Sequence, residues 1–488
     1  MGIPTDDRSP FDDTPSYEEL KEVVAALRLL TEQQSGQIAE LESEIAKLKE
    51  RLGRNPRNSS MPPSAEGLSK PPAANRAERR AAKRRPGKQP GSEGKHLAQV
   101  LDPDVVMTHT PAACTGCGAD LADAGVTGVE RRQVFELPEV RAFVTEHRME
   151  RRRCACGCET KAPAPLEATA PACYGPGIRA LAVYLSVYQH VPYDRLAEIF
   201  VDVVGISVSV GAIAAMVSEA GGALGLFVSV VTDLLRDAPT VHFDETGARV
   251  EGSLHWVHVA SSALYTLLCC HKRRGGIAMD DMGVIEAMTG VAVHDGWKPY
   301  RSYDVVHALC NAHHLRELDG VIERFGQEWA QQMITLLLDA KESVEQAIER
   351  GDVGLDPGVL HSIRVRYGKL IAKGWSANAE ASAARPGKWY KNTATNLLKR
   401  LDTYRDDVLR FTVDFNAPFS NNQGERDIRM VKLQQKISGS WRTKTGADHF
   451  CAIRSYVSTM KKQDYDVLEG LGRLFIGDAW LPTMVPRT

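Results

Sequence analysis

The chain has 488 residues, of which 43% are hydrophobic and 25% charged, a composition that excludes a disordered or fibrous chain. This length exceeds one ordinary hydrophobic core, so we expect roughly two to four domains. The net charge of −2 does not decide whether the chain binds nucleic acid, because a basic segment can be hidden in that average.

Residues 17–52 are predicted to form a coiled-coil helix. Ten heptad positions alternate steps of four and three, and eight of them are apolar: 20, 24, 27, 31, 34, 38, 41, 45, 48 and 52. An apolar stripe at this spacing packs against a second helix in a coiled coil, so we expect a homodimer. The alternative is a helix that packs on its own protein. Gly53 is expected to end the helix.

Residues 53–95 are predicted to be a basic, disordered linker. Pro, Ser, Gly, Lys and Arg dominate this segment, and little of it could be buried. The overlapping stretch 51–95 holds 12 Lys or Arg and 3 Asp or Glu, a net charge of +9. A local charge of that size favours a polyanion, and we expect Arg84, Arg85 and Lys88 to contact DNA phosphates. The alternative is a solvated linker.

Residues 96–165 are predicted to form a small zinc-binding module. Five of the ten cysteines gather here in closely spaced groups, which favours a reduced compartment and a metal over a secreted disulfide framework. Cys114-x-x-Cys117 has the usual spacing of a zinc knuckle. Strand-like runs at 132–137 and 141–148 predict a short hairpin between the two groups.

The second cysteine group offers three candidates for two ligand positions. Cys154 and Cys156 are the expected ligands, with Cys158 as a substitute. Because a module this small has a poor hydrophobic core, a structural Zn²⁺ would supply folding energy. The alternative is a set of unligated thiols in a domain that has lost its metal.

Residues 174–236 are predicted to be helical. Two helices between Pro192 and Glu219, interrupted by Gly205, suggest a helix-turn-helix that contacts DNA, although such pairs are often only structural. The apolar stretch 206–235 contains charged residues and is rich in Gly and Ser, so we expect buried helices and no membrane span. The N-terminus has neither a basic start nor an apolar core, and no signal peptide is expected.

Residues 237–475 are predicted to contain an α/β catalytic domain with an RNase H-like fold. The expected elements are strands at 240–243, 253–261, 263–271 and 290–294, with a helix at 279–288 before the last of them. The first strand is expected to end at Asp244 and the fourth at Asp295. In that fold the first and fourth strands are neighbours, so these two side chains can meet.

A third carboxylate is expected on a helix beside this sheet. Four polar residues share one face of that helix, at i, i+3, i+4 and i+7: Asn422, Glu425, Arg426 and Arg429. A polar face on a helix that packs against a sheet is explained by a metal site. Ser420 or Asn421 is expected to cap the start of the helix.

Three carboxylates in this order suit metal-dependent phosphoryl transfer. Asp and Glu oxygens bind Mg²⁺ or Mn²⁺ and leave coordination places for phosphate and water. Two such ions about 3.5–4 Å apart activate the attacking oxygen and stabilise the leaving one. Arg426 and Arg429, with Asn422, are expected to bind the phosphate. Since a single Asp at a strand end is commonly only a loop cap, the interpretation depends on all three carboxylates.

Several motifs resemble those of bacterial insertion sequence 66 family transposases. In the catalytic region they are FDET at 243–246, HDGWKPY at 294–300, CNAHHLREL at 310–318 and FSNNQGERDIRMVK at 419–432. Upstream, NPRNSSMPPS at 55–64 and RRPGKQPGSEGKHL at 84–97 resemble the linker of that family. The cysteine groups resemble its zinc module and the heptads its N-terminal helix, so the similarity runs from about residue 20 to about residue 475.

The resemblance implies that Asp244, Asp295 and Glu425 are the catalytic triad. The 130 residues from Asp295 to Glu425 exceed what an RNase H core needs. Residues 316–408, which are expected to form long helices, are therefore implied to be an all-helical insertion.

Cys310-x-x-His313 looks like a signature that many transposases carry after the second Asp. The alternative is a buried thiol and a core histidine. Two departures from the family pattern are visible. The second cysteine knuckle is irregular, and the segment 436–449 differs in amino-acid sequence although it keeps a Gly and a Trp.

The resulting hypothesis is a DNA transposase of an insertion sequence, acting on the nucleoid in the bacterial cytoplasm. The linker, the zinc module and the helical pair would bind double-stranded DNA at terminal inverted repeats. The triad would expose 3′-OH ends and join them to target DNA, and accessory proteins of the same element are suggested partners. The alternatives are an RNase H-like nuclease without strand transfer and a catalytically silent, zinc-containing DNA-binding protein.

Overall fold

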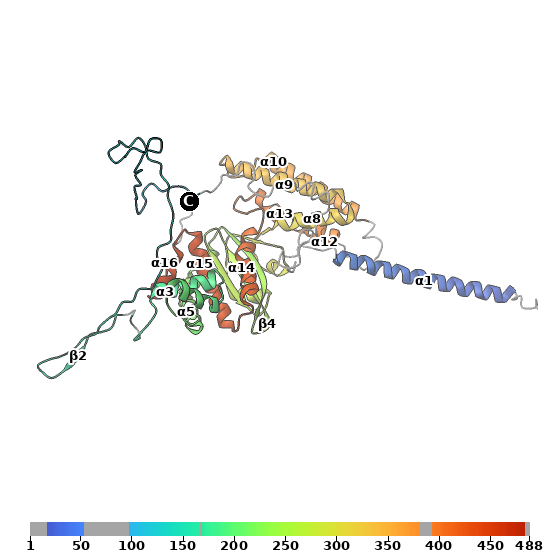
Figure 1. Ribbon diagram of the computed structural model, residues 1–488. Coiled ribbons are helices and arrows are strands. Elements are labelled where there is room, and N and C mark those ends of the chain that lie inside the picture. The colour runs from blue at the N-terminus through green and yellow to red at the C-terminus, as the bar shows by residue number, and fades with distance from the viewer. Residues whose placement is uncertain (1–16, 53–96, 166–167, 169, 380–392, 484–488) are drawn as a thin grey trace, which may run out of the picture. The chain divides into compact units, whose positions relative to one another are not determined.

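The computed structural model describes residues 17–52, 97–165, 168, 170–379 and 393–483 (Figure 1). Contacts among these residues divide them into two compact units. The first unit contains α1 (Tyr17–Leu52) with residues 229–379 and 393–432, and the second contains residues 97–228 and 433–483. The predicted linker, with Arg84, Arg85 and Lys88, lies outside the described residues.

A five-stranded sheet forms the centre of the first unit. Its strands are β3 (Thr240–Val250), β4 (Ser253–Ser261), β5 (Thr266–His271), β6 (Val291–His294) and β7 (Val306–Leu309), in the order β5-β4-β3-β6-β7. β3, β4 and β5 form an antiparallel meander, whereas β6 pairs with β3 and β7 pairs with β6 in parallel. The expected adjacency of the first and fourth strands is therefore present.

Three predicted elements differ in their boundaries. β5 starts at Thr266 and not at residue 263, because residues 262–265 form the turn from β4. The first strand does not end at Asp244, because β4 pairs with β3 from His242 to Val250 and keeps it extended. The helix after β5 is α7 (Gly276–Met282), which starts and ends earlier than predicted. Gly283 ends it in a left-handed conformation, with a φ of +69°.

The start of β6 lies directly against the start of β3. A Cβ atom at Gly290 would lie 2.2 Å from the carbonyl oxygen of Ala238 and 2.5 Å from that of Pro239. The next residue, Val291, donates its N–H to the Pro239 carbonyl at 2.9 Å. Only glycine allows this close approach, which sets where the parallel pairing of β3 and β6 begins.

Between β7 and α14 the described chain is largely helical, as the sequence predicts for residues 316–408. The elements are α8 (Asn311–Phe325), α9 (Glu328–Glu349), α10 (Pro357–Ala377), α12 (Thr393–Thr403), α13 (Arg405–Val408) and the 3-10 turn η5 (Arg410–Thr412). α9 and α10 lie side by side (Figure 1). Trp329, Tyr367 and Leu401 are buried in one hydrophobic core that these helices share.

The second unit is mainly helical. Its elements include α3 (Pro176–Val183), η2 (Tyr184–Tyr188), α4 (Tyr193–Ile199), η3 (Phe200–Val204), α5 (Val210–Gly222), α15 (Lys444–Lys462) and α16 (Val467–Leu474), where η2 and η3 are π-helical turns. The predicted helical pair is present, because Gly205, with a φ of +72°, ends η3 and Ser209 caps α5. α5 packs on α15, where a Cβ at Gly221 would lie 2.4 Å from the His449 Cβ.

The sequence places its most apolar stretch in α5 and α6 (Gly225–Arg236). No single helix in the described ranges is long and apolar enough to cross a membrane. α5 and α6 taken together reach the required length and apolar composition, but they are bent at their junction.

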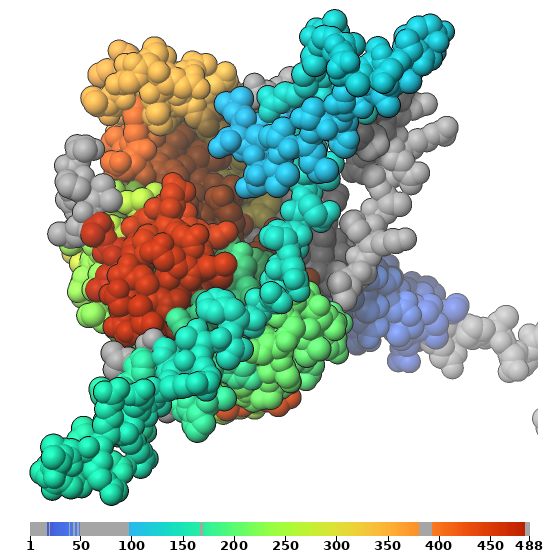
Figure 2. Space-filling view, turned by 60° about the vertical axis from the view of Figure 1, so that its left-hand side comes forward, coloured from blue at the N-terminus to red at the C-terminus, as the bar shows by residue number. Residues whose placement is uncertain are grey.

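Residues 97–165 differ from the prediction. The runs 132–137 and 141–148 form no strands; the hairpin here consists of β1 (Arg151–Arg153) and β2 (Glu159–Lys161) instead. Side-chain contacts replace a backbone ladder, with the Gln133 amide donating to the Val100 carbonyl at 2.8 Å. Val134 and Phe143 are 88% and 91% exposed, so these apolar side chains are not buried against another part of the described chain as they would be in a half-buried strand. Figure 2 shows this part of the chain, coloured blue to teal, as narrow extended segments.

α1 forms the helix predicted for residues 17–52, and it presents the predicted apolar stripe to solvent. Leu20, Leu27, Ile38 and Leu41 are 49% to 58% exposed. The described chain therefore leaves this stripe open to a second helix.

Candidate active site

Asp244 and Asp295 come to adjacent positions on neighbouring parallel strands. The last pair in the register of β3 with β6 is His242 with Val293; Asp244 lies two residues further along β3, and Asp295 directly follows the end of β6 at His294. Neighbouring strands lie about 4.8 Å apart, and aligned residues face the same side of a sheet. The strand register thus brings together the two aspartates that the sequence singled out.

The chain turns sharply after Asp295. The Trp297 N–H donates to Asp295 Oδ1 at 2.8 Å, and Gly296 has a φ of +88°. The Gly296 N–H lies 3.0 Å from His294 Nδ1 and donates to it, so Nε2 of that ring carries the proton and donates to His307 Nδ1 at 3.0 Å. Burial lowers the pKa of both histidines, which keeps this chain of neutral rings in place behind Asp295.

Asn421 fastens the start of α14 (Asn422–Ser438) to the sheet. Its Nδ2 donates to the Phe243 carbonyl at 2.7 Å, and its Oδ1 lies 2.9 Å from His242 Nδ1. Its side chain therefore binds β3 and does not cap the helix as predicted. The Glu425 N–H donates to the Asn421 carbonyl at 3.2 Å, so the first turn of α14 holds Glu425 close enough to Asp244 for its charge to raise the pKa of that residue.

The acidic side chains share one electrostatic environment. Burial and then the charges of Glu245, Asp295 and Glu425 raise the pKa of Asp244 well above its usual value. Crowded carboxylates repel one another when ionised, and a divalent cation relieves that repulsion. The donor set is made of oxygens, which Mg²⁺ and Mn²⁺ prefer. The residues present therefore fit a divalent metal.

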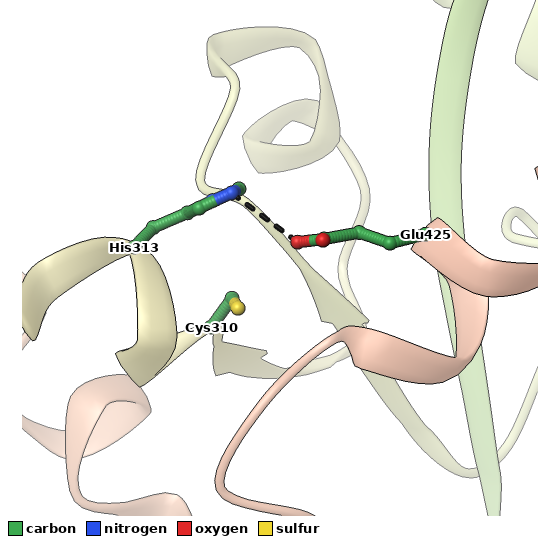
Figure 3. Close-up of side chains that lie close together, drawn as sticks. All are labelled: Cys310, His313 and Glu425. Atoms are coloured by element: carbon green, nitrogen blue, oxygen red, sulfur yellow. Dashed lines mark ion pairs between the residues drawn. The ribbon is translucent and has the colours of Figure 1, made fainter. Parts of the chain in front are cut away.

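His313 and Cys310 lie beside Glu425 (Figure 3). His313 Nε2 is 3.3 Å and an Arg316 guanidinium nitrogen 3.9 Å from Glu425 Oε1. His313 and then Arg316 lower the pKa of Glu425, whereas burial raises the pKa of Cys310 to about 11. The structure thus brings the Cys-x-x-His pair to the third carboxylate.

Glu245 is a site residue that sequence reasoning missed. Its side chain is 2% exposed, forms an ion pair with Arg274 at 2.6 Å and accepts the Tyr300 hydroxyl at 2.8 Å. Burial and then the charge of Asp295 raise its pKa. Its partners Arg274 and Tyr300 lie 29 and 55 residues further along the chain, so the sequence around Asp244 does not reveal these contacts. Tyr300, in the 3-10 turn η4 (Lys298–Ser302), was a usable signal because it follows Asp295 within one motif.

Arginines surround these carboxylates. Arg274 lies over the rings of Trp256 and Trp297, with its guanidinium 4.7 Å and 4.0 Å from their centres. Arg400 forms an ion pair with Glu317, and the charge of Asp295 opposes the lowering of its pKa by burial. Arg400 comes from a helix far along the chain from the sheet, so no local pattern in the sequence could place it.

Three of the four residues of the polar face predicted for α14 are exposed, and the fourth, Glu425, is half-buried. Asn422, Arg426 and Arg429 are exposed, while Ile428 and Val431 are buried on the opposite face. The two arginines are therefore accessible to a ligand on the helix that carries the third carboxylate.

The module cysteines occupy two turns. The N–H groups of Cys117 and Gly116 lower the pKa of Cys114. In the second turn the Cys158 N–H lowers the pKa of Cys156, and the Cys154 N–H donates to the Cys158 carbonyl at 2.8 Å. Turns that favour thiolates fit zinc.

The ligand pairing between the two turns stays a prediction. Among the described residues, no three of the module sulfurs lie within 4.8 Å of one another. The choice of Cys154 and Cys156 over Cys158 is therefore not decided by these turns.

Three known protein families match parts of the chain. The transposase IS66 family matches residues 171–449, a range that includes all three carboxylates. The zinc-finger binding domain of transposase IS66 matches residues 111–158, which hold all five module cysteines. A family of unknown function matches residues 7–98. No curated protein matches the chain.

Proposed function

The chain belongs to the transposase IS66 family, and from that premise we propose that Asp244, Asp295 and Glu425 form the centre that cuts and joins DNA. The observation that carries this proposal is the electrostatic interaction among these three carboxylates. Both aspartates follow the parallel pairing of β3 with β6, which ends at His242 and Val293, and the charges of Asp295 and Glu425 both raise the pKa of Asp244.

The strand order supports an RNase H-like fold for this centre. Three antiparallel strands followed by two parallel ones, ordered β5-β4-β3-β6-β7, put two carboxylates side by side at the middle of the sheet. α14 adds the third carboxylate from outside the sheet. The helices α8 to α13 form an insertion between β7 and α14, with a hydrophobic core to which Trp329 and Tyr367 belong.

Bound Mg²⁺ or Mn²⁺ would activate the attacking oxygen and stabilise the leaving oxygen. Asp244, Asp295 and Glu425 would hold these ions. The Trp297 N–H orients Asp295, and Asn421 orients the helix that carries Glu425.

The reaction has two steps. Water attacks the phosphorus at each end of the element, and the P–O3′ bond breaks to leave a 3′-OH on the element. That 3′-oxygen then bonds to a target phosphorus and displaces a target 3′-OH. Asn422, Arg426 and Arg429 contact the phosphates from the exposed face of α14.

DNA recognition lies upstream of the catalytic centre. The module at residues 111–158 holds structural Zn²⁺, in keeping with its family, and contacts the terminal inverted repeats. The linker, with Arg84, Arg85 and Lys88, adds contacts to phosphates, and the pair of helices around Gly205 adds a second surface. α1 joins two chains, and accessory proteins of the same element complete the assembly on bacterial DNA in the cytoplasm.

Metal-dependent cutting tests the catalytic assignment. Purified full-length protein is incubated with labelled DNA that carries candidate element ends, with Mg²⁺, with Mn²⁺ or with chelator. Asp295→Asn is expected to abolish cleavage and keep binding to the ends. Asp339→Asn is the matched control and should cut normally. Asp339 lies on α9 and forms a surface ion pair with Arg366 of α10. Cleavage by Asp295→Asn at the normal rate would reject the assignment.

The same reactions separate the rival functions. Joined products identify strand transfer, whereas cut ends without joining favour a nuclease. Binding to DNA without any metal-dependent cutting favours a catalytically silent, zinc-containing DNA-binding protein.

A further inference from the structure

Cys310, His313 and Glu425 offer sulfur, nitrogen and oxygen to one point (Figure 3). Their ligand atoms all lie within 4.8 Å of one another. Cys310 directly precedes α8 and His313 is in its first turn, while Glu425 is in the first turn of α14. Two helix starts that are far apart in the sequence therefore converge on the cluster.

The spacing of these atoms is close to that of a zinc site. Zn–S bonds are about 2.3 Å and Zn–N bonds about 2.0–2.1 Å, so the ligands of a tetrahedral ion lie roughly 3.5 Å apart. His313 Nε2 and Glu425 Oε1 are already 3.3 Å apart. The Cys310 sulfur has to approach by no more than about 1.3 Å, within the reach of a side-chain adjustment.

The hydrogen bonds of the cluster leave room for an ion. Glu425 Oε1 is buried and forms no hydrogen bond of ordinary geometry in the described chain; it faces only His313 Nε2 at 3.3 Å and an Arg316 nitrogen at 3.9 Å. Buried polar atoms rarely stay in that state, and a bound cation would satisfy the carboxylate oxygen. The Asn421 N–H donates to Cys310 Sγ at 3.1 Å, which stabilises a thiolate ligand.

The charges nearby also favour a cation. A thiolate and a carboxylate together neutralise a divalent ion, and the acidic group of Asp244 lies close enough for its pKa to be raised by Glu425. Arg316, 3.9 Å from Glu425 Oε1, is the cation that faces the cluster from α8. It balances Glu425 when no ion is bound.

We propose that Cys310, His313 and Glu425 bind Zn²⁺, and that the bound ion holds Glu425 away from Asp244 and Asp295 and thereby inhibits DNA cleavage. Mg²⁺ takes oxygen ligands and leaves thiolates aside, whereas Zn²⁺ accepts sulfur, nitrogen and oxygen together. The same glutamate thus serves two metals, one at a time. The inhibitory half of this inference rests on the proposed function, and the binding half does not.

Zinc content tests the binding half. Full-length protein is equilibrated with a zinc buffer, and zinc per chain is measured by elemental analysis. Cys310→Ser and His313→Asn are expected to hold about one zinc fewer than wild type, because each removes one ligand of the cluster. Cys270→Ser replaces a buried cysteine of β5 and should match wild type. The module cysteines are unchanged in all four proteins, so the difference reports on the cluster. Equal zinc in wild type and both ligand variants would overturn the site.

DNA cleavage tests the inhibitory half. The cleavage rate of each protein in zinc is divided by its own rate in Mg²⁺ alone. Inhibition by zinc can then be measured even in a variant that cuts DNA more slowly than wild type. The zinc concentration for half inhibition should rise at least about tenfold in Cys310→Ser relative to wild type. Zinc binding to the cluster without inhibition would overturn this half. If wild type does not cut DNA at all, the proposed function fails, and zinc content still decides the site.

Discussion

Asp244 is surrounded by three other carboxylates in a position that is largely shielded from water. Burial and the charges of Glu245, Asp295 and Glu425 all favour its protonated form. Residues with strongly shifted pKa values gather at functional sites because a ligand or a reaction requires the arrangement. In the proposed metal centre, a bound divalent cation would relieve this repulsion.

Asp244→Asn should make the metal-free protein more stable at neutral pH. The pKa of Asp244 is higher in the folded protein than in the unfolded chain, where it is about 3.8. Protonation of this carboxyl therefore contributes to the stability of wild type at low pH, and this contribution is lost as pH rises through the folded-state pKa. The asparagine variant has no such loss. In chelator its advantage in unfolding free energy should grow with pH to on the order of 1 kcal/mol.

Thermal unfolding across that pH range measures the difference, with Asp339→Asn as the control. Mg²⁺ should stabilise wild type more than the variant, since only wild type keeps all the ligands. An advantage that shrinks as pH rises would contradict the electrostatic account.

At the residue scale the sequence predicted Asp244, Asp295 and Glu425 but not their neighbours. The three acids follow recognisable strands or lie on a helix with a polar face, and motifs mark them. Glu245 lies within the FDET motif, but its partner Arg274, like the partner Glu317 of Arg400, comes from a distant part of the chain, so the pairing of neither residue could be predicted.

Close packing of α5 on α15 shows what holds an element in place. Gly221 is buried, and a Cβ there would lie 2.4 Å from the His449 Cβ. Gly222, the next residue, has nothing within 4 Å of its Cβ position. The two glycines therefore separate a packing requirement from a general effect of glycine on helix stability.

Gly221→Ala should destabilise the protein by about 1–3 kcal/mol, because the added methyl group forces His449 and its helix to move. Gly222→Ala should have no cost and could gain a few tenths of a kcal/mol from better helix propensity. Chemical denaturation of the three proteins measures both effects. Equal stability of the two variants would show that α5 and α15 do not pack as described.

At the element scale, the sequence predicted the strands with strong pairing better than those with none. β4 and β6 are found close to their predicted ranges. The runs 132–137 and 141–148 have the residue types of strands, but in the described chain they form only isolated hydrogen bonds, such as Gln133 to Val100 and Ala142 to Val204, and no continuous strand pairing. β3 exceeds its prediction for the opposite reason, since β4 pairs with all of it from His242 onward.

On the scale of the whole molecule, α1 is the element through which we propose that two chains associate. It is a 36-residue helix whose predicted heptad includes Leu27, Ile38 and Leu41, each more than half exposed. Heptad periodicity is visible in the sequence, and the helix forms as expected. The identity of the partner helix is a property of the assembly and cannot be read from one chain.

Leu41→Lys should weaken self-association by at least about tenfold, because a charge replaces an apolar residue in the seam. Gln37→Lys, an exposed position outside the heptad stripe, is the matched control and should leave association unchanged. Sedimentation of the full-length proteins over a range of concentrations measures the effect. Equal association of wild type and Leu41→Lys would place the dimer interface elsewhere.

The rate of single-turnover cleavage in Asp244→Asn, Asp295→Asn, Glu425→Gln and the triple variant tests the central claim most directly. If the three carboxylates act as one metal centre, each single variant should cut about as slowly as the triple variant, since removing any one member disables the unit. Asp339→Asn should cut at the wild-type rate. A single variant that keeps a rate within about tenfold of wild type, under the same metal conditions, would contradict the claim for that residue and for the shared centre.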